Sequence, residues 1–213
     1  MLISHKYKFV TIDIPKTGTR SLRETLYTEN RVVDVIGMPH DRPLNQHASI
    51  VDVEAGFEQN GWNFDEYYKY TVIRNPWDRY FSFFKYYKML ADEHPHQKYP
   101  STMAFKHGKW AFNFFRKQSI NKVMDELINN NPAQSSYLLD RDGMCKFDRI
   151  TRFENLLQGF KGFCHDVGIG PFELKHANKT PGSLYRDDIL TQSHIDMIAE
   201  KEKWLIEKFK YEY

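Results

Sequence analysis

The sequence lacks any apolar run long enough for a membrane-spanning helix, which needs roughly 20 predominantly apolar residues. Its amino-terminal stretch, MLISHKYKFV, also lacks the apolar segment of a secretory signal peptide. From these two absences we expect a soluble, intracellular protein that has no membrane anchor.

Cysteine is scarce, and neither sign of charge is in large excess. Cys145 and Cys164 show neither CxxC spacing nor a regular pairing with histidine, so we expect reduced thiols and no metal site. The 30 Lys and Arg residues nearly balance the 28 Asp and Glu residues, which argues against nucleic acid or a membrane surface as the partner of the whole molecule. With 41% hydrophobic residues, the 213-residue chain suits one domain, residues 1–213, around a sizeable core.

The sequence also lacks the GxxxxGK[ST] motif of the commonest phosphate-binding loop. It has instead FVTIDIPKTGTRSLRETL, in which an apolar run is followed by a polar loop and an amphipathic pattern. This order predicts a strand over residues 8–14 and a helix from residue 19 or 20 to residue 27. The start of such a helix offers free amides and the positive end of the helix dipole to an anion.

The residue types in this loop suit an oxyanion. Gly18 allows close approach of the main chain, Lys16 adds a positive charge, and Thr17, Thr19 and Ser21 add hydroxyl donors. An ordinary strand-to-helix turn with a surface lysine explains the loop equally well at this point.

A second segment, YYKYTVIRNPWDRYFSFFKYYKML, repeats the strand-to-helix pattern. We expect a strand over residues 68–73 and a helix with Pro76 at its first position. Arg74 then lies at the carboxyl end of the strand, where ligands bind in open α/β sheets, and Ser82 lies two turns along the helix. The two side chains are predicted to converge on one phosphate, although an arginine paired to a nearby aspartate and a solvated serine are the ordinary alternative.

The remaining pattern alternates strands with helices. We expect strands at residues 31–37, 135–139 and 147–153, and helices that follow Ser49, cover residues 119–130, run to Gly168 and end the chain. Strands that alternate with helices predict a three-layer α/β fold, with a central, mainly parallel sheet flanked by helices.

IPKTGTRSL and VIRNPWDRYFSFFKYY resemble the two signature motifs of sulfotransferases that use 3′-phosphoadenosine 5′-phosphosulfate (PAPS). The resemblance continues through QHAS, QSSYLL, DRITRFENL and HANKT, and it is closest to the carbohydrate branch that includes the uronyl 2-O-sulfotransferases (sulfotransferase family 2). It implies a P-loop-like fold, PAPS as the sulfuryl donor, 3′,5′-ADP as the product, and an acceptor hydroxyl on a glycan. Because the Golgi relatives are membrane-anchored and this sequence shows no such segment, we expect a cytoplasmic enzyme of bacterial or viral type, with a trimmed domain of a Golgi lumenal enzyme as the alternative.

The resemblance also implies residue roles. Lys16 would stabilise the charge that develops on the leaving nucleotide, and His47 would be the general base, with His40 and Glu54 as the next candidates. The residues implied to bind the nucleotide are Lys16, Thr17, Gly18, Thr19, Arg20 and Ser21 at the 5′ side, Arg74 and Ser82 at the 3′-phosphate, and Lys179 or Thr180 from a closing loop. Arg20 departs from the family pattern, in which a small hydroxyl residue is frequent, so its side chain would contact the phosphate, pair with another charge or point elsewhere.

Two other functions stay open on the sequence. A small-molecule kinase that uses ATP and Mg²⁺ would explain the phosphate loops, but the chain lacks the P-loop order and an apolar strand that ends in a Mg²⁺-binding aspartate. A non-catalytic nucleotide-binding module would leave His47 without a role. Acceptor contacts are expected from residues 38–47 and 91–118. The second range holds five basic residues that form either a patch for an anionic glycan or a set of solvated charges: Lys106, His107, Lys109, Arg116 and Lys117. The aromatic cluster at residues 80–87 predicts a core helix rather than a sugar-stacking platform. The oligomeric state is left open.

Overall fold

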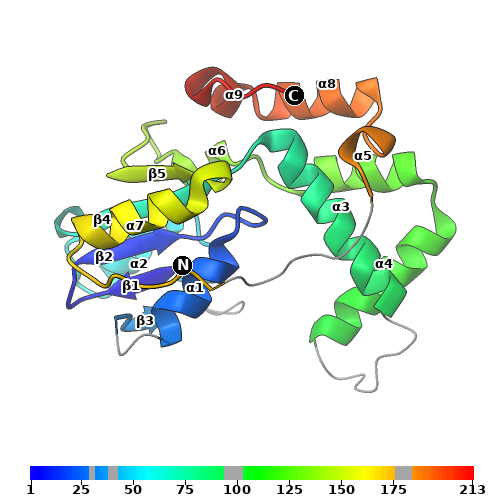
Figure 1. Cartoon of the computed structure of the whole chain (residues 1–213). Coiled ribbons are helices and arrows are strands. Elements are labelled where there is room, and N and C mark those ends of the chain that lie inside the picture. Colours follow the sequence, from blue (N-terminus) through cyan, green and yellow to red (C-terminus); the bar gives the residue numbers. More distant parts are fainter. Residues whose placement is uncertain (29–31, 38–42, 94–102, 176–183) are drawn as a thin grey trace. The chain divides into compact units, whose positions relative to one another are not determined.

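The computed structural model describes residues 1–28, 32–37, 43–93, 103–175 and 184–213, with the backbone alone for residues 103–108 (Figure 1). The chain divides into two compact units. The first unit comprises Met1–Asn75 and Ala133–Asn178, and the second comprises Pro76–Pro132 and Lys179–Tyr213. The organisation of residues 1–213 as a single domain stays a prediction.

A five-stranded sheet forms the centre of the first unit, in the order β3-β1-β2-β4-β5. Strand β4 pairs in parallel with both β2 and β5, whereas β1 runs antiparallel to β2 and β3, so four strands point one way and one points the other. The predicted α/β fold with a mainly parallel sheet is thereby confirmed. The strands are β1 (Leu2–Ser4), β2 (Phe9–Ile12), β3 (Val35–Ile36), β4 (Tyr68–Ile73) and β5 (Arg149–Arg152).

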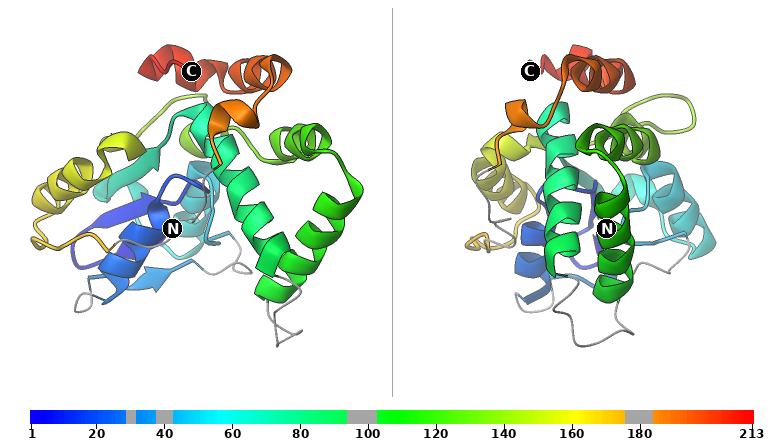
Figure 2. Two further views of the ribbon diagram at one scale, coloured as in Figure 1. Left: turned by 45° about the vertical axis from the view of Figure 1, so that its right-hand side comes forward. Right: turned by 90° about the vertical axis from the view of Figure 1, so that its right-hand side faces the viewer.

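Helices cover both faces of this sheet (Figure 2). Helices α1 (Thr19–Thr28) and α7 (Leu156–Asp166) lie on one face and α2 (Ile50–Gln59) lies on the other. Apolar residues one turn apart on α1 and α7 pack onto the strands, and Phe163 stacks on Tyr70 of β4 with ring centroids 4.3 Å apart. As predicted, Ser49 caps α2, and it does so as part of a capping box with Asp52.

Between α2 and α7, three short elements complete the first unit: η1 (Phe64–Glu66), α6 (Ser135–Leu138) and η3 (Phe153–Asn155). The prediction of a strand over residues 135–139 is wrong, because Ser135–Leu138 form one helical turn, α6. A five-residue apolar run is too short for its periodicity to separate a strand from a helix. Conversely, β1 was not predicted, because only three residues of the amino-terminal stretch are extended.

The second unit is helical in the described residues. Its elements are α3 (Pro76–Glu93), α4 (Met103–Lys117), α5 (Ile120–Asn130), η4 (Arg186–Asp188), α8 (Gln192–Lys201) and α9 (Lys203–Phe209). The single final helix expected from the sequence is two helices that meet at Glu202. The carboxylate of Glu202 is completely buried and pairs with Arg79 at 3.0 Å, and Arg79 also donates to the carbonyl oxygen of Pro132 at 3.0 Å.

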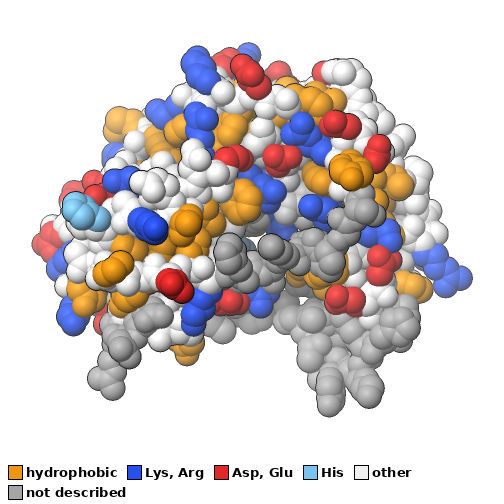
Figure 3. Space-filling view, viewed as in Figure 1, with side chains coloured by type: hydrophobic (Ala, Val, Ile, Leu, Met, Phe, Trp, Pro, Cys, Tyr) orange, Lys and Arg blue, Asp and Glu red, His pale blue; other side chains and the backbone are white. Residues whose placement is uncertain are grey.

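The described surface mixes charges of both signs. Lys and Arg side chains are interspersed with Asp and Glu side chains on the face viewed in Figure 3. Within the described ranges, no helix combines the length and the apolar character needed to cross a membrane. The same ranges hold no cluster of three or more His, Cys, Asp or Glu side chains that would suit a metal ion.

Candidate functional site

The loop between β2 and α1 is tightly folded. Lys16 and Gly18 both adopt left-handed backbone conformations, with φ of 68° and 82°. The hydroxyl group of Thr17 donates to the carbonyl oxygen of Ile14 at 2.9 Å, and the Ser21 amide donates to the carbonyl oxygen of Gly18 at 3.1 Å. The predicted hydroxyl donor Thr17 therefore holds the loop in shape, and its side chain is buried.

Gly18 is required at its position for two reasons. A residue with a side chain rarely adopts its positive φ, and a Cβ atom there would lie 2.6 Å from Cε2 of Phe153. Phe153 begins η3, directly after β5, so the segment that follows β5 supports the loop from the side.

The main chain of this loop presents donors. In the part of the chain that the structure describes, the amides of Thr17, Gly18 and Thr19 donate no hydrogen bond. These amides precede or begin α1, where the partial positive charge of the helix dipole is greatest. The loop thus has the donors and the close-approach glycine that an oxyanion of a nucleotide requires.

Arg74 joins the two predicted phosphate segments. Its main-chain amide donates to the side chain of Gln134 at 2.9 Å, and its carbonyl oxygen accepts from the same side chain at 2.8 Å. Its guanidinium Nη1 donates to the carbonyl oxygen of Lys16 at 3.2 Å and its Cζ lies 4.3 Å from the centroid of the Phe153 ring. Because β2 and β4 are parallel neighbours, the segments after them meet at one edge of the sheet.

Two supporting residues were missed by the sequence analysis. Gln134 fixes the main chain of Arg74, and Phe153 contacts both Gly18 and Arg74. Both residues occur in segments on which the family resemblance rests, QSSYLL and DRITRFENL, but nothing in their type or spacing indicates these contacts.

Arg20 is directed away from the loop. Its exposed side chain donates to Glu24 one turn along α1, at 2.8 Å. Three alternatives were left open for the Arg20 side chain, and the structure shows the second, in which it pairs with another charge.

His47 is hydrogen-bonded to Asp13, the residue that follows β2, at the same end of the strand as the loop. Its Nδ1 lies 2.7 Å from the carbonyl oxygen of Asp13, and its own amide donates to the side chain of Asn45 at 2.9 Å. A carbonyl oxygen only accepts, so Nδ1 carries the hydrogen and Nε2 keeps its lone pair in the neutral ring.

Burial lowers the pKa of His47 from its ordinary value of 6.5, although the hydrogen bond to Asp13 and the Asp13 charge oppose this shift. The ring is therefore neutral at pH 7, as a proton acceptor must be. The Asp13 carboxylate is itself buried and lies 3.1 Å from the Met1 ammonium group and 3.9 Å from Arg23.

The remaining predicted site residues belong to the second unit, to α2 or to the part of the chain that the structure does not describe. Ser82 lies on α3 in the second unit, where it is largely buried, so its convergence with Arg74 on one phosphate stays a prediction. Lys179, Thr180 and His40 lie outside the described residues. Glu54 is half-buried on α2.

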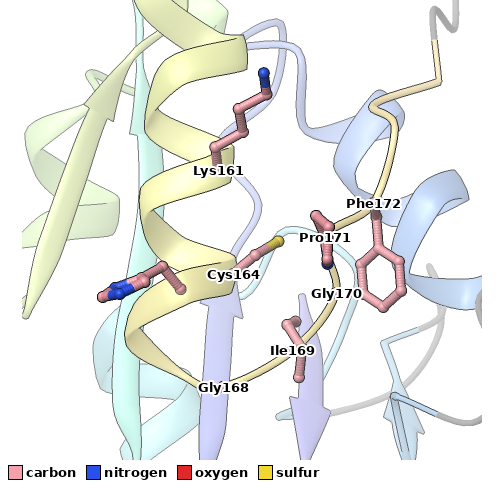
Figure 4. Close-up of a pocket in the computed structure, with 8 residues that line it drawn as sticks. Lys161, Cys164, Gly168, Ile169, Gly170, Pro171 and Phe172 are labelled. Carbon is pink, nitrogen blue, oxygen red and sulfur yellow. The ribbon is translucent and has the colours of Figure 1, made fainter.

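The first unit also contains a cavity of about 320 Å³, and none of the predicted site residues that the structure describes lines it (Figure 4). It lies between α7 and the segment Gly168–Phe172, with Cys164 on its wall. Burial raises the pKa of the Cys164 thiol to about 11, so the thiol is protonated and unreactive at neutral pH.

Comparison with known proteins supports the interpretation of the loop. The sequence model of the Sulfotransferase family matches residues 1–198, which include the loop, Arg74, Ser82 and His47. A search of curated proteins and a search of solved structures found no significant match. Because the family match covers most of the chain, the protein belongs to the sulfotransferase family.

Proposed function

We propose that this sulfotransferase transfers a sulfuryl group from PAPS to a hydroxyl group of a carbohydrate, as in the branch that includes the uronyl 2-O-sulfotransferases. The observation that carries the proposal is the contact between the two strand-end segments. Arg74 donates to the Lys16 carbonyl, beside amides that have no partner in the described part of the chain. Cationic and amide donors therefore lie close together after β2 and β4, which supports the binding of a phosphate-bearing nucleotide at this edge of the sheet.

The residues of this loop fit the 5′-phosphosulfate group. The amides of Thr17, Gly18 and Thr19 would hold it, and Gly18 would let it approach the main chain. Arg20 would contribute through its main chain, because its side chain pairs with Glu24. Arg74 and Ser82 would hold the 3′-phosphate, and Lys179 or Thr180 would contact the nucleotide.

When bound, PAPS would supply an activated sulfuryl group. The Lys16 ammonium group would stabilise the negative charge that develops on the leaving oxygen, which lowers the barrier because the donor is held in place beforehand. Nε2 of His47 would take the proton of the acceptor hydroxyl while Nδ1–H stays bonded to the Asp13 carbonyl oxygen. The Asp13 carbonyl therefore orients the ring for this role.

The test is thermal unfolding with 3′,5′-ADP, with 5′-ADP, and with ATP plus Mg²⁺, each at the same concentration. A ligand at 100 times its Kd adds about 2.7 kcal/mol to the free energy of unfolding. We expect 3′,5′-ADP to raise the midpoint most, and Arg74→Met to reduce that rise. Arg141→Met, which replaces an exposed arginine of the same unit, is the matched control and should leave it unchanged. If ATP with Mg²⁺ stabilises the protein as well or better, the PAPS proposal is wrong and a kinase function replaces it.

A further inference from the structure

The second unit contains a small cavity among α3, α4 and α5 that the proposed chemistry does not use. Its volume is about 190 Å³, below the roughly 300–1,000 Å³ of pockets for drug-sized ligands, so it suits a single ring-sized group. The residues that line it are Tyr87, Trp110, Phe114, Glu126, Leu127, Asn130 and Asn131.

Aromatic rings form one side of this cavity. Trp110 stacks on Phe114 with ring centroids 4.9 Å apart and an interplanar angle of 19°, and Tyr87 meets Trp110 edge-on at 5.2 Å. Trp110 nevertheless remains 48% exposed. An indole ring that is held by two neighbours and still exposed provides a rigid apolar platform, and little side-chain entropy is lost when a ligand stacks on it.

Polar side chains of α5 form the other side. Within the described ranges, the side chains of Glu126 and Asn130 make no hydrogen bond, whereas the Asn131 amide donates to the carbonyl oxygen of Leu127 at 2.8 Å. A carboxylate accepts hydrogen bonds from hydroxyl groups, and a carboxamide both donates and accepts. A pyranose ring matches this pairing, because one face carries C–H groups and the rim carries hydroxyl groups.

The charge of the residues that line the cavity further restricts the class of ligand. Glu126 is the one charged residue among those that line it in the described part of the chain. The exposed basic residues Lys109, Arg116 and Lys117 lie on α4 but do not line the cavity. A uronate or sulfated ring would therefore bring a second negative charge next to Glu126, with no cation among the described lining residues to offset it.

We propose that this cavity binds one neutral pyranose ring of the acceptor, which stacks on Trp110 and is hydrogen-bonded by Glu126 and Asn130. The assignment of this sugar to the acceptor rests on the proposed function, whereas the binding itself does not. The cavity would thus select acceptors that carry an uncharged sugar.

The experiment compares methyl β-D-glucopyranoside with methyl β-D-glucuronide, which differ only in the carboxylate at C6. Binding is followed by tryptophan fluorescence and by saturation-transfer NMR. We expect the glucoside to bind in the millimolar range and the glucuronide at least about fivefold more weakly. In Glu126→Gln the two affinities should become equal, because the repulsion is removed.

Trp110→Ala should abolish glucoside binding. Asn130→Ala changes an exposed residue and should weaken glucoside binding severalfold, so it tests the proposal even if Trp110→Ala fails to fold. Tyr27→Ala, which removes an exposed aromatic ring from α1, is the matched control and should bind normally. Equal binding by Trp110→Ala and the unaltered protein, or preference for the glucuronide, would overturn the inference.

Thermal unfolding with 3′,5′-ADP distinguishes failure of the sugar-site proposal from failure of the proposed function. If the glucoside binds through Trp110 but 3′,5′-ADP does not stabilise the protein, the sugar site stands and the proposed function fails. If 3′,5′-ADP stabilises the protein but the glucoside does not bind, only the sugar site is wrong.

Discussion

At the scale of single residues, His47 is the side chain most directly tied to the proposed chemistry. Its Nδ1–H bond to the Asp13 carbonyl fixes the ring, and its Nε2 would be the base in the proposed mechanism. In His47→Asn, the carboxamide can still donate to that carbonyl but cannot accept a proton. We expect kcat to fall by about 10²- to 10⁴-fold with unchanged 3′,5′-ADP affinity, measured by 3′,5′-ADP release from PAPS and by calorimetry. A variant with normal kcat would remove His47 from the mechanism.

The lowered pKa of His47 predicts a pH dependence. Because burial disfavours the protonated ring, the base form persists below pH 6.5, and the acidic limb of kcat/KM should lie below that value. The unfolded chain binds the proton more readily, so stability is unaffected above about pH 6.5 and falls as pH drops from there toward the lowered pKa.

The measurement is the difference in melting temperature between the protein and His47→Gln across this range. The unaltered protein should lose more stability than the variant as the pH falls below 6.5. An acidic limb at or above pH 6.5, or parallel stability curves, would contradict the predicted shift.

Gly18 allows the cost of backbone conformation to be separated from the cost of a clash. Gly143 has a similar positive φ of 74° but open space around it, whereas a Cβ atom at Gly18 meets Phe153. Gly143→Ala should cost about 1–2 kcal/mol, and Gly18→Ala should cost more and weaken 3′,5′-ADP binding. Urea denaturation measures the loss in free energy of unfolding for both variants. Equal losses would contradict the prediction and show that the Phe153 ring moves aside without a measurable free-energy cost.

At the scale of secondary structure elements, features that depend on neighbouring residues could be predicted from the sequence. Features that depend on contacts between distant residues could not. The strand, loop and helix around Gly18 follow from an apolar run, a glycine and an amphipathic pattern, all close together in the sequence. By contrast, the contact of His47 with Asp13 spans 34 residues and uses a main-chain atom, so no residue pattern reports it. The ion pair between Arg79 and Glu202, at the junction of α8 and α9, likewise joins residues 123 positions apart.

The buried Arg79–Glu202 pair predicts a strong coupling between α3 and the junction of α8 and α9. Both side chains have no exposed surface. Arg79→Met should cost about 3–5 kcal/mol, because it removes the positive charge that pairs with a buried carboxylate. Arg79→Met combined with Glu202→Leu should cost less than the sum of the two single changes, as measured by urea denaturation. Additive costs would mean that the pair is not coupled.

At the scale of the whole molecule, the family match runs through both compact units, over residues 1–198. The residues proposed to bind the nucleotide are likewise divided, with Lys16 and Arg74 in the first unit and Ser82 in the second. The fold class and the strand, loop and helix around Gly18 could be predicted because they follow from contiguous motifs. The proposed sugar site could not, since its cavity is assembled from three helices by packing.

The most direct test of the central claim is transfer of radiolabelled sulfuryl groups from PAPS to a panel of desulfated polysaccharides. We predict transfer by the unaltered protein to at least one polysaccharide, and a loss of about 100-fold or more in both Lys16→Ala and His47→Asn. If PAPS gives no transfer to any polysaccharide, or if both variants transfer at the unaltered rate, the account of the loop and of His47 is contradicted.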